Sequence, residues 1–290
     1  MESMGNDGNK MWMSAPAKLN ICLRVLGRRD DGFHEIETLM VRLPGLADRV
    51  EIGEAAEFVF ECDAEGVPCD ESNLAVRAVR VFERVTGVEV RGRLRLEKRV
   101  PHGAGLGGGS SDAAAVLRLL ARRSGGVDQA GLMEMAAELG SDVPFFLFDG
   151  AAWCRGRGER IEPVSGLPAM PVVLLKPWFG VATPDAYGRW KDAEALPGVD
   201  YGPQWCPAGE LVNELERPVF SKHVFLAEMK EWLRARGEVE AALMSGSGST
   251  VFGVLRDEAD AEGVIEAARE ELDPDLWGWG GVTGGASNIE

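Results

Sequence analysis

Apolar residues recur along the first part of the chain with two different periods. From residue 17 to residue 25 every second side chain is apolar, which is the period of a strand with one buried face. A turn at residues 31–32 and a second apolar run over 33–43 predict the returning strand of a hairpin. Alternating stretches at 57–63 and 94–100 predict two further strands, the second of which stops before a proline.

A helical period separates these strands and then follows them. Residues 73–85 place their apolar side chains on one side of a helix. Residues 113–120 carry apolar side chains at i, i+3, i+4 and i+7, and the triplet at 110–112 (Ser-Ser-Asp) consists of preferred N-cap types, so a helix is predicted to begin just after the serines. Another helix is predicted over 129–139, ended by Gly140.

The composition changes beyond Glu162, where prolines become frequent. This change predicts two domains, at residues 12–163 and 164–285. The second part predicts, in order, a strand, a helix, a strand–turn–strand and a helix, at residues 171–176, 221–236, around 245–249 and 261–272. Strands and helices are mixed without a regular βαβ alternation, so the class is predicted to be α+β.

Charge and hydropathy limit the classes of partner. The 31 Lys and Arg against 47 Asp and Glu give a net charge of -16, a field that repels nucleic acid. Mean hydropathy is -0.09 and every apolar run is far shorter than the ~20 residues of a membrane span. The first ten residues are polar, are predicted to be a flexible leader and lack a secretory apolar region; Met11 or Met13 is a second candidate start.

Cysteine usage points to a reducing compartment. The five cysteines are an odd number and have no CxxC spacing, which argues against a disulfide framework and a zinc site. These observations predict a soluble, cytoplasmic protein, most simply an enzyme, that binds neither nucleic acid nor membrane. It is expected to be a monomer or a weak homodimer.

A glycine-rich segment lies between the strand at 94–100 and the helix that follows. Glycines let backbone N–H groups approach a ligand, and the helix dipole favours an anion at the same point, so this segment predicts a phosphate site. A flexible linker is the alternative, but linkers rarely join a strand directly to a capped helix. The predicted phosphate-binding residues are Pro101, Gly103, Gly105, Leu106, Gly107, Gly108, Gly109, Ser110 and Ser111.

Neither of the two common phosphate motifs fits this segment. Gly103, Gly105 and Gly108 have the spacing of a dinucleotide fingerprint, but that fold needs an acidic residue ~20 positions later at the end of a strand. The nearest candidate, Asp128, stands just before a helix. A Walker A loop ends in Gly-Lys-Ser or Gly-Lys-Thr, whereas this loop ends in Gly-Ser-Ser.

The segment resembles the second motif of the GHMP kinases (galactokinase, homoserine kinase and mevalonate kinase), whose glycine-serine loop wraps the phosphates of ATP. Further blocks are similar to the branch of that family that phosphorylates 4-diphosphocytidyl-2-C-methyl-D-erythritol. All of the blocks occur in the family's order, at residues 15–20 with 27–35, 101–115, 139–146 with 156–159, and 244–248.

The resemblance implies a two-domain fold, with a ribosomal-protein-S5-domain-2-like N-terminal domain that binds ATP and a ferredoxin-like C-terminal α/β sandwich. It implies transfer of the ATP γ-phosphate to the 2-hydroxyl of the CDP-linked methylerythritol, a step of the non-mevalonate (MEP) route to isoprenoids. Two alternatives stay open: another small-molecule kinase of this family, and a non-catalytic nucleotide-binding protein with the same fold.

The resemblance also implies roles for single residues. Lys18 and Asp142 match the catalytic pair, Asp142 to accept the hydroxyl proton and Lys18 to stabilise the alkoxide. Without the resemblance, Lys18 would be interpreted as a solvated lysine on a strand and Asp142 as a turn residue. The implied substrate-binding residues are Asn20, Phe33, His34, Asp142, Thr183, Tyr187, Asn213, Gly246 and Ser247.

Two positions in these blocks depart from the family, and one cofactor lacks an assigned ligand. Phe33 replaces the tyrosine of a Tyr-His pair that recognises cytosine, and Glu214 replaces an aspartate after Asn213. Mg²⁺ is expected together with ATP, because the phosphates need charge neutralisation. Its protein ligand is unknown: Ser110, Ser111 or water alone are all open.

Overall fold

The computed structural model describes residues 4–7 and 10–284. A long antiparallel pair of strands runs through the first half, with β2 and β3 in register from Met11 opposite Ile52 to Arg28 opposite His34. The sheet built on this pair has the order β4-β5-β3-β2-β10-β9, with β1 added to β2 and β6-β7 added to β3. Its strands are β1 (Met4–Asp7), β2 (Lys10–Arg28), β3 (His34–Gly53), β4 (Phe58–Cys62), β5 (Gly92–Glu97), β6 (Ala151–Gly156), β7 (Arg160–Val164), β9 (Gln204–Cys206) and β10 (Gly209–Asn213).

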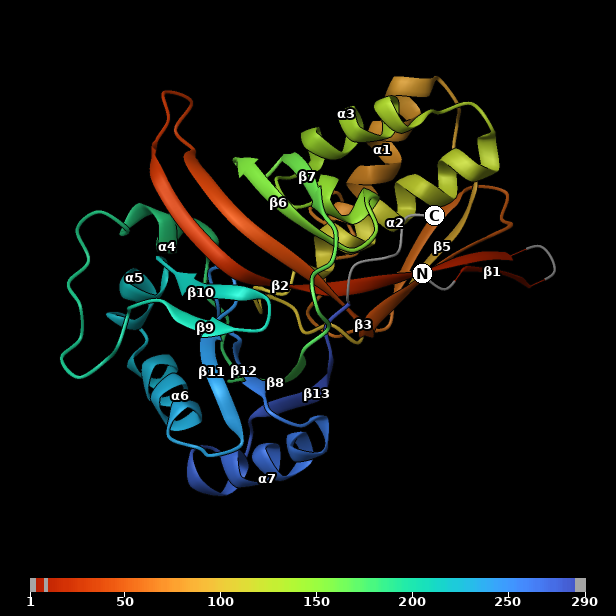
Figure 1. Cartoon of the computed structure of the whole chain (residues 1–290). Coiled ribbons are helices and arrows are strands. Elements are labelled where there is room, and N and C mark those ends of the chain that lie inside the picture. Colours follow the sequence, from red (N-terminus) through yellow and green to blue (C-terminus); the bar gives the residue numbers. More distant parts are fainter. Residues whose placement is uncertain (1–3, 8–9, 285–290) are drawn as a thin grey trace.

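Three helices pack together against this sheet (Figure 1). They are α1 (Leu74–Thr86), α2 (Gly108–Ser124) and α3 (Gln129–Leu139), followed by the short turn of helix η1 (Pro144–Leu147). Residues 74–86 form a helix because Asn73 caps its start, its side chain accepting from the Ala75 N–H, and Gly87 ends it in the left-handed region. The element order β2-β3-β4-α1-β5-α2 agrees with the N-terminal domain that the resemblance implied.

The second sheet is antiparallel throughout and has the order β11-β12-β8-β13. Its strands are β8 (Pro171–Lys176), β11 (Val239–Met244), β12 (Val251–Leu255) and β13 (Trp277–Val282). The helices of this half are α4 (Thr183–Gly188), α5 (Glu216–Phe220), α6 (Val224–Arg234) and α7 (Ala261–Glu271), with the single turn η2 (Glu258–Asp260). The order strand, helices, two strands, helix, strand is that of a ferredoxin-like sandwich, so the predicted α+β fold is confirmed.

Both faces of the second sheet are buried. Val173 and Leu175 belong to the core shared with α6 and α7, whereas Val172 and Leu174 belong to a core shared with Leu19 and other residues of the first sheet. This double burial explains why residues 171–176 read as a continuous apolar run without alternation.

The halves are also joined by a strand. β10 pairs in parallel with β2, Val212 opposite Cys22 and Asn213 opposite Leu23, so a segment of the second half extends the first sheet. The boundary expected between residues 163 and 164 stays a prediction, and residue 285 lies outside the described residues.

Three features differ from or add to the sequence-based expectations. The leader is not wholly flexible, because Met4–Asp7 pairs with residues 10–13. The sequence Gly-Trp-Gly-Gly at residues 278–281, for which no element was predicted, forms part of β13, an edge strand paired with β8. All five cysteines are free thiols. Over 4–7 and 10–284, no helix combines the length and the apolarity that crossing a membrane requires.

Candidate active site

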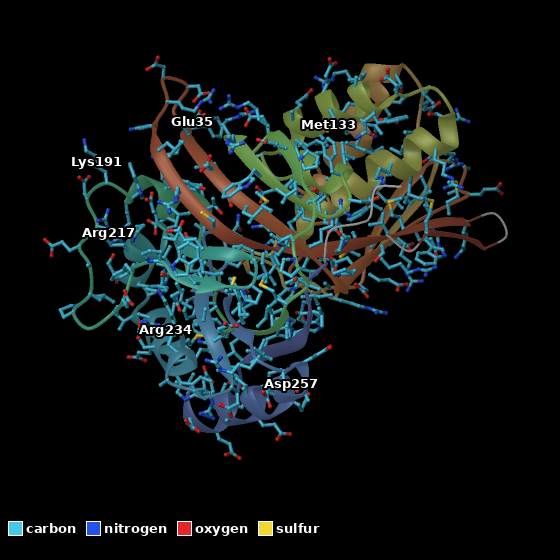
Figure 2. The ribbon with its side chains drawn as sticks, in the orientation of Figure 1. Glu35, Met133, Lys191, Arg217, Arg234 and Asp257 are labelled. Atoms are coloured by element: carbon cyan, nitrogen blue, oxygen red, sulfur yellow. The ribbon has the colours of Figure 1, made fainter. Side chains whose placement is uncertain are left out.

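A cavity of about 1140 Å³ lies where both halves of the chain meet. On one side the end of the β2–β3 hairpin and α4 approach it, and on the other side the starts of α1 and α2 do so (Figure 1). Figure 2 shows Glu35 of the hairpin and Lys191, which follows α4, on the same side of the molecule. The lining comes from residues 18–40, 67–74, 98–112, 141–157, 181–192 and 246–248.

Lys18 and Asp142, the pair to which the resemblance gives the catalytic roles, lie close together at this cavity. The Lys18 ammonium lies 3.7 Å from Asp142 Oδ2, and it donates to Asn20 Oδ1 at 2.5 Å and to the Gly105 carbonyl at 2.9 Å. The Lys18 side chain is 4% exposed, and this burial lowers its pKa although the Asp142 carboxylate acts in the opposite direction. The Asp142 side chain is 31% exposed, so its carboxylate is open to a ligand.

Asn20 fixes the direction in which Lys18 reaches. Its Nδ2 donates to Thr38 Oγ1 on the neighbouring strand at 2.8 Å, which leaves Oδ1 turned toward the Lys18 ammonium. Lys18 and Asn20 share one face of β2 because side chains two residues apart on a strand point the same way. The strand therefore supplies a rigid base for the lysine.

The first glycine loop (residues 101–107) has left-handed glycines at alternate positions. Gly103, Gly105 and Gly107 have φ angles of 64°, 74° and 70°, and the helix α2 starts immediately afterwards at Gly108. The expected start just after the serines was wrong: Gly107 is the N-cap, and Ser110 and Ser111 lie inside the first turn. The left-handed glycine turns the chain into the helix without a capping side chain.

This earlier start changes which atoms form the predicted phosphate site. The first N–H groups of a helix have no acceptor within it, and in α2 these belong to Gly108, Gly109 and Ser110, all of which line the cavity. Ser111 is different, because its N–H donates to the Gly107 carbonyl and its buried hydroxyl has no hydrogen-bond partner among the described residues. Ser110 therefore fits an anion or metal role better than Ser111.

A second glycine loop (residues 245–249) packs against the first. Ser245 Oγ donates to the Gly105 carbonyl at 3.1 Å, and the Thr250 N–H donates to the Ala104 carbonyl at 3.1 Å. A Cβ built on Gly246 would lie 3.2 Å from the Lys18 ammonium, so this loop is adjacent to the Lys18–Asp142 pair. Thr183 and Ser247, both expected at the site, share a hydroxyl hydrogen bond of 2.8 Å.

A buried acidic pair lies beneath the start of α2, and sequence reasoning missed it. Lys98 forms ion pairs with Asp48 and with Asp112, the latter at 2.7 Å. Asp48 also accepts from the N–H groups of Arg99 and Val100. One lysine cannot neutralise two carboxylates, and burial raises the pKa of Asp112 to about 8. Lys98 and Asp112 line the cavity, but only the Asp in the Ser-Ser-Asp triplet gave any signal in the sequence.

Aromatic rings gather at the hairpin side of the cavity. The His34 ring lies 5.3 Å from the Tyr187 ring and 6.2 Å from the Trp190 ring. Burial, with a contribution from Arg28, lowers the pKa of His34, so its imidazole is neutral at pH 7. Phe33 is 49% exposed, and the Cζ atom of the Arg157 guanidinium lies over its ring, 4.7 Å from the ring centre. Trp190 was not expected, because its segment shows neither periodicity nor a motif.

Not every predicted residue reaches the cavity. Asn213 is buried behind the second glycine loop and is absent from the cavity lining, so the expected direct contact with substrate is not supported by its position. Glu214, the departure from the family, accepts from the Val25 N–H at 2.7 Å and reinforces the β10–β2 junction.

No resident metal centre is formed by the side chains that the structure describes. Over residues 4–7 and 10–284 there is no group of three or more His, Cys, Asp or Glu side chains placed to hold a metal ion. A cation carried by a phosphate ligand needs few protein ligands, and Ser110 and Asp142 are among the cavity-lining residues that offer it a side-chain oxygen.

Comparisons with known proteins agree with this geometry. The GHMP kinases N-terminal domain matches residues 73–150, and the GHMP kinases C-terminal domain matches residues 206–273. The chain is 42% identical over 271 residues to the 4-diphosphocytidyl-2-C-methyl-D-erythritol kinase of Methylacidiphilum infernorum (isolate V4), covering 91% of this chain and 93% of the relative.

Solved structures show the same fold. A crystal structure of 4-(cytidine 5'-diphospho)-2C-methyl-D-erythritol kinase matches with a TM-score of 0.76 and 37% identity, covering 95% of this chain and 100% of the other. Homoserine kinase from Cytophaga hutchinsonii matches with a TM-score of 0.68 at 18% identity, covering 97% and 96% of the two chains, which shows the fold alone.

Proposed function

The chain belongs to the GHMP kinases and, within them, to the 4-diphosphocytidyl-2-C-methyl-D-erythritol kinases, and we propose that it transfers the γ-phosphoryl group of ATP to the 2-hydroxyl of that cytidyl compound. The observation that carries this proposal is the Lys18 ammonium, held between Asp142, Asn20 and the first glycine loop. We infer the substrate from the names of the relatives given above, and the reaction type from the residues that line the cavity.

Lys18 and Asp142 have complementary tasks in such a transfer. Phosphoryl transfer depends mostly on positioning and on stabilising charge, with little demand for a strong base. The carboxylate of Asp142, which is one-third exposed, accepts the hydroxyl proton and orients the hydroxyl oxygen. The buried ammonium of Lys18 stabilises the negative charge that develops on this oxygen, and burial strengthens the interaction because little water screens it.

The phosphate-bearing part of ATP fits the start of α2. The first N–H groups of α2, those of Gly108, Gly109 and Ser110, belong to residues that line the cavity and can bind a phosphate. Gly107 lets the chain pass close to Lys18, because a Cβ on Gly107 would lie 2.9 Å from Lys18 Cγ. ATP supplies the phosphoryl group, and Mg²⁺, which we propose accompanies it, supplies charge neutralisation. The earlier residues of the site, Pro101 and Leu106, shape this side of the cavity.

The cytidyl part fits the aromatic side. His34 and Tyr187 lie in contact there, and Phe33 is exposed at the same end. A flat base stacks favourably on such rings, at ~1–3 kcal/mol per contact. The neutral His34 imidazole both donates and accepts a hydrogen bond, as a cytosine edge requires. Phe33 keeps the ring of the family's tyrosine and loses only its hydroxyl.

An ADP-release assay with Mg-ATP tests the proposal. The acceptors are 4-diphosphocytidyl-2-C-methyl-D-erythritol, methylerythritol phosphate, mevalonate and homoserine at equal concentration. Turnover confined to the cytidyl compound is the expected result. Turnover with another acceptor instead would support a kinase but refute the proposed substrate. If none of the four acceptors were phosphorylated while ATP still bound, a non-catalytic nucleotide-binding protein would be favoured.

Replacing His34 with alanine is expected to raise KM for the cytidyl compound by about ten- to a hundredfold and to leave KM for ATP within about twofold. The reason is that His34 lies among the aromatic rings and away from α2. His223→Ala is the matched control, because His223 stacks on Phe179 at 5.2 Å and does not line the cavity. An unchanged KM for the cytidyl compound in His34→Ala would refute the base-reading role.

The setting of the reaction is part of the proposal. Five free thiols fit a reducing compartment, and we place the reaction in the cytoplasm. That the chain acts as a monomer or a weak homodimer, without nucleic acid or membrane, stays a prediction.

A further inference from the structure

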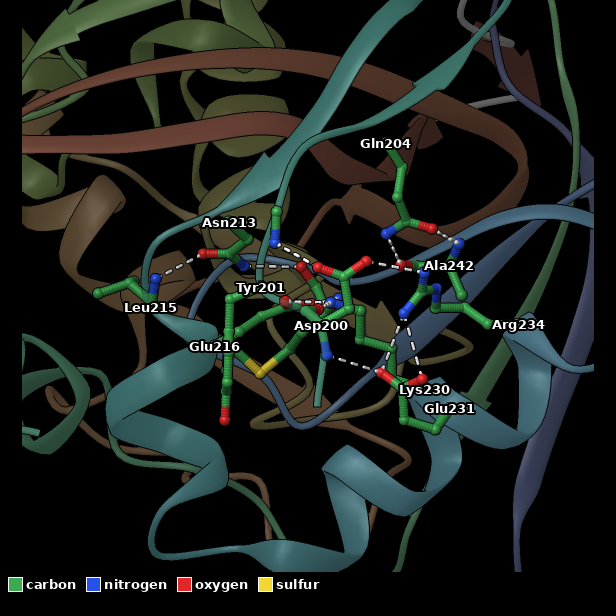
Figure 3. A network of polar contacts seen from close by, with 12 residues as sticks. Asp200, Tyr201, Gln204, Asn213, Leu215, Glu216, Lys230, Glu231, Arg234 and Ala242 are labelled. Atoms are coloured by element: carbon green, nitrogen blue, oxygen red, sulfur yellow. Dashed lines mark hydrogen bonds and ion pairs between the residues drawn. The ribbon is translucent and has the colours of Figure 1, made fainter. Parts of the chain in front are cut away.

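Three buried polar side chains lie behind the second glycine loop and hold its first residues. Asn213 is 4% exposed, Glu216 is 1% exposed and Lys230 is fully buried, and none of them lines the cavity. Figure 3 shows Asn213, which ends β10, together with Glu216 of α5 and Lys230 of α6. Burying a charged pair costs desolvation energy, so this pair contributes little to stability. Its position next to the active site therefore indicates a functional role.

Glu216 and Lys230 fix the residue that leads into the loop. The Lys230 ammonium donates to Glu216 Oε2 at 2.6 Å and to the Asp200 carbonyl at 2.7 Å. This leaves Glu216 Oε1 to accept from the N–H of Met244, the last residue of β11, at 2.9 Å. The ion pair therefore anchors the backbone immediately before Ser245.

Asn213 holds the carbonyls of the same segment. Its Nδ2 donates to the Met244 carbonyl at 2.7 Å and to the Gly246 carbonyl at 2.8 Å. Its Oδ1 accepts from the Leu215 N–H at 2.9 Å, so the amide is fixed in one orientation. Both polar groups of Met244 and the carbonyl of Gly246 are thus held from behind the loop.

Because the two polar groups of a peptide unit are fixed relative to each other, holding the Gly246 carbonyl also sets the direction of the Ser247 N–H. The Gly246–Ser247 peptide is trans, so its carbonyl and its N–H point in opposite directions. Asn213 draws the Gly246 carbonyl away from the cavity, and the Ser247 N–H consequently points toward it. In the described part of the chain this N–H has no acceptor, and Ser247 lines the cavity.

We propose that Asn213 and the Glu216–Lys230 ion pair are positioning residues that aim the Ser247 N–H at a phosphate oxygen of a bound substrate. The inference rests on the proposed kinase function and extends it to residues that touch no substrate. The Lys18 ammonium, 3.2 Å from where a Cβ of Gly246 would be, places this donor beside the reacting groups. The phosphate belongs either to the diphosphate of the cytidyl acceptor or to ATP.

The first test compares two amide-to-alanine substitutions on the same network. Asn213→Ala frees the Gly246 carbonyl, so it is expected to raise KM for the acceptor or for ATP by about tenfold or more. The substrate whose KM rises identifies the phosphate. Gln204→Ala is the control, because Gln204 bonds the N–H and carbonyl of Ala242, two residues before Met244, at 3.1 and 2.7 Å. It is expected to lower Tm and to leave both KM values within about twofold.

The second test separates the hydrogen bond to Met244 from the ion pair. Lys230→Met combined with Glu216→Gln removes both charges but keeps an acceptor for the Met244 N–H, so it is expected to retain near-wild-type KM values. Lys230→Met combined with Glu216→Leu removes the acceptor as well, and it is expected to reproduce the change in KM of Asn213→Ala. Because both double variants leave no buried charge unpaired, they are expected to fold.

A binding measurement keeps this proposal separate from the proposed function. In protein labelled with ¹⁵N-serine, the Ser247 amide signal is identified by its loss in Ser247→Ala and is then followed during titration with CDP and with ADP. A shift with one of them in the wild type, reduced in Asn213→Ala, supports the positioning role even if no acceptor is phosphorylated. The proposal is overturned if Asn213→Ala changes KM no more than Gln204→Ala does, or if the Ser247 amide responds to neither nucleotide.

Discussion

Replacing Asp142 with asparagine is expected to lower kcat by about 10²- to 10⁴-fold while leaving ATP binding nearly intact. An amide has the shape of the carboxylate but cannot accept the proton of the acceptor hydroxyl. Asp142 lies 3.7 Å from the Lys18 ammonium and is one-third exposed, so its loss leaves the first glycine loop and the start of α2 in place. Single-turnover ADP formation measures the chemical step, and calorimetry with an ATP analogue measures binding.

Asp149→Asn is the matched control for this variant. Asp149 also lies 3.7 Å from a cation, the Arg42 guanidinium, but it is 52% exposed and does not line the cavity. The control is expected to keep the wild-type kcat. If Asp142→Asn were fully active, Asp142 would have no part in proton transfer and Lys18 would have to carry the chemistry without it.

Replacing Gly105 with alanine is expected to cost about 3 kcal/mol or more of unfolding free energy and to weaken ATP binding strongly. The added Cβ would lie 2.3 Å from the Ser245 carbonyl oxygen and 2.9 Å from that of Gly248, so the two glycine loops would have to separate. Gly105 also has a φ of 74°, a conformation that alanine adopts only with strain. Urea denaturation and a titration with an ATP analogue measure the two effects.

Gly103→Ala separates the strain from the steric clash. Gly103 has a similar φ of 64°, but the nearest atom to its added Cβ is the Gly180 Cα at 3.8 Å. This variant is expected to cost only about 1 kcal/mol. Equal losses of stability in the two variants would show that backbone strain alone is responsible and that the contact between the glycine loops contributes little.

Local sequence patterns correctly predicted the elements that a capping residue or a continuous apolar run marks. The helix over 129–139 and the strand over 171–176 agree with α3 and β8 to the residue, because capping by Asp128 and an uninterrupted apolar run mark them clearly. The helix α2 was placed about four residues too late, since serine at an N-cap is the usual signal and here a left-handed glycine replaces it. The strands β9 and β10 were missed because they are short, and because β10 also pairs with β2, which is distant in the chain.

The sequence by itself determined the chemistry that is available: a glycine-rich loop before a helix, a lysine on a strand, an aspartate after a helix and the family to which these motifs belong. Only the tertiary structure decided how they combine. It brought Lys18 to Asp142 and Gly105, placed Asn213 behind the second glycine loop instead of in the cavity, and joined Lys98 to Asp112 under α2. The physical reason is that the hydrophobic period and the turn residues act over a few positions, whereas these contacts depend on how two sheets pack through a shared core.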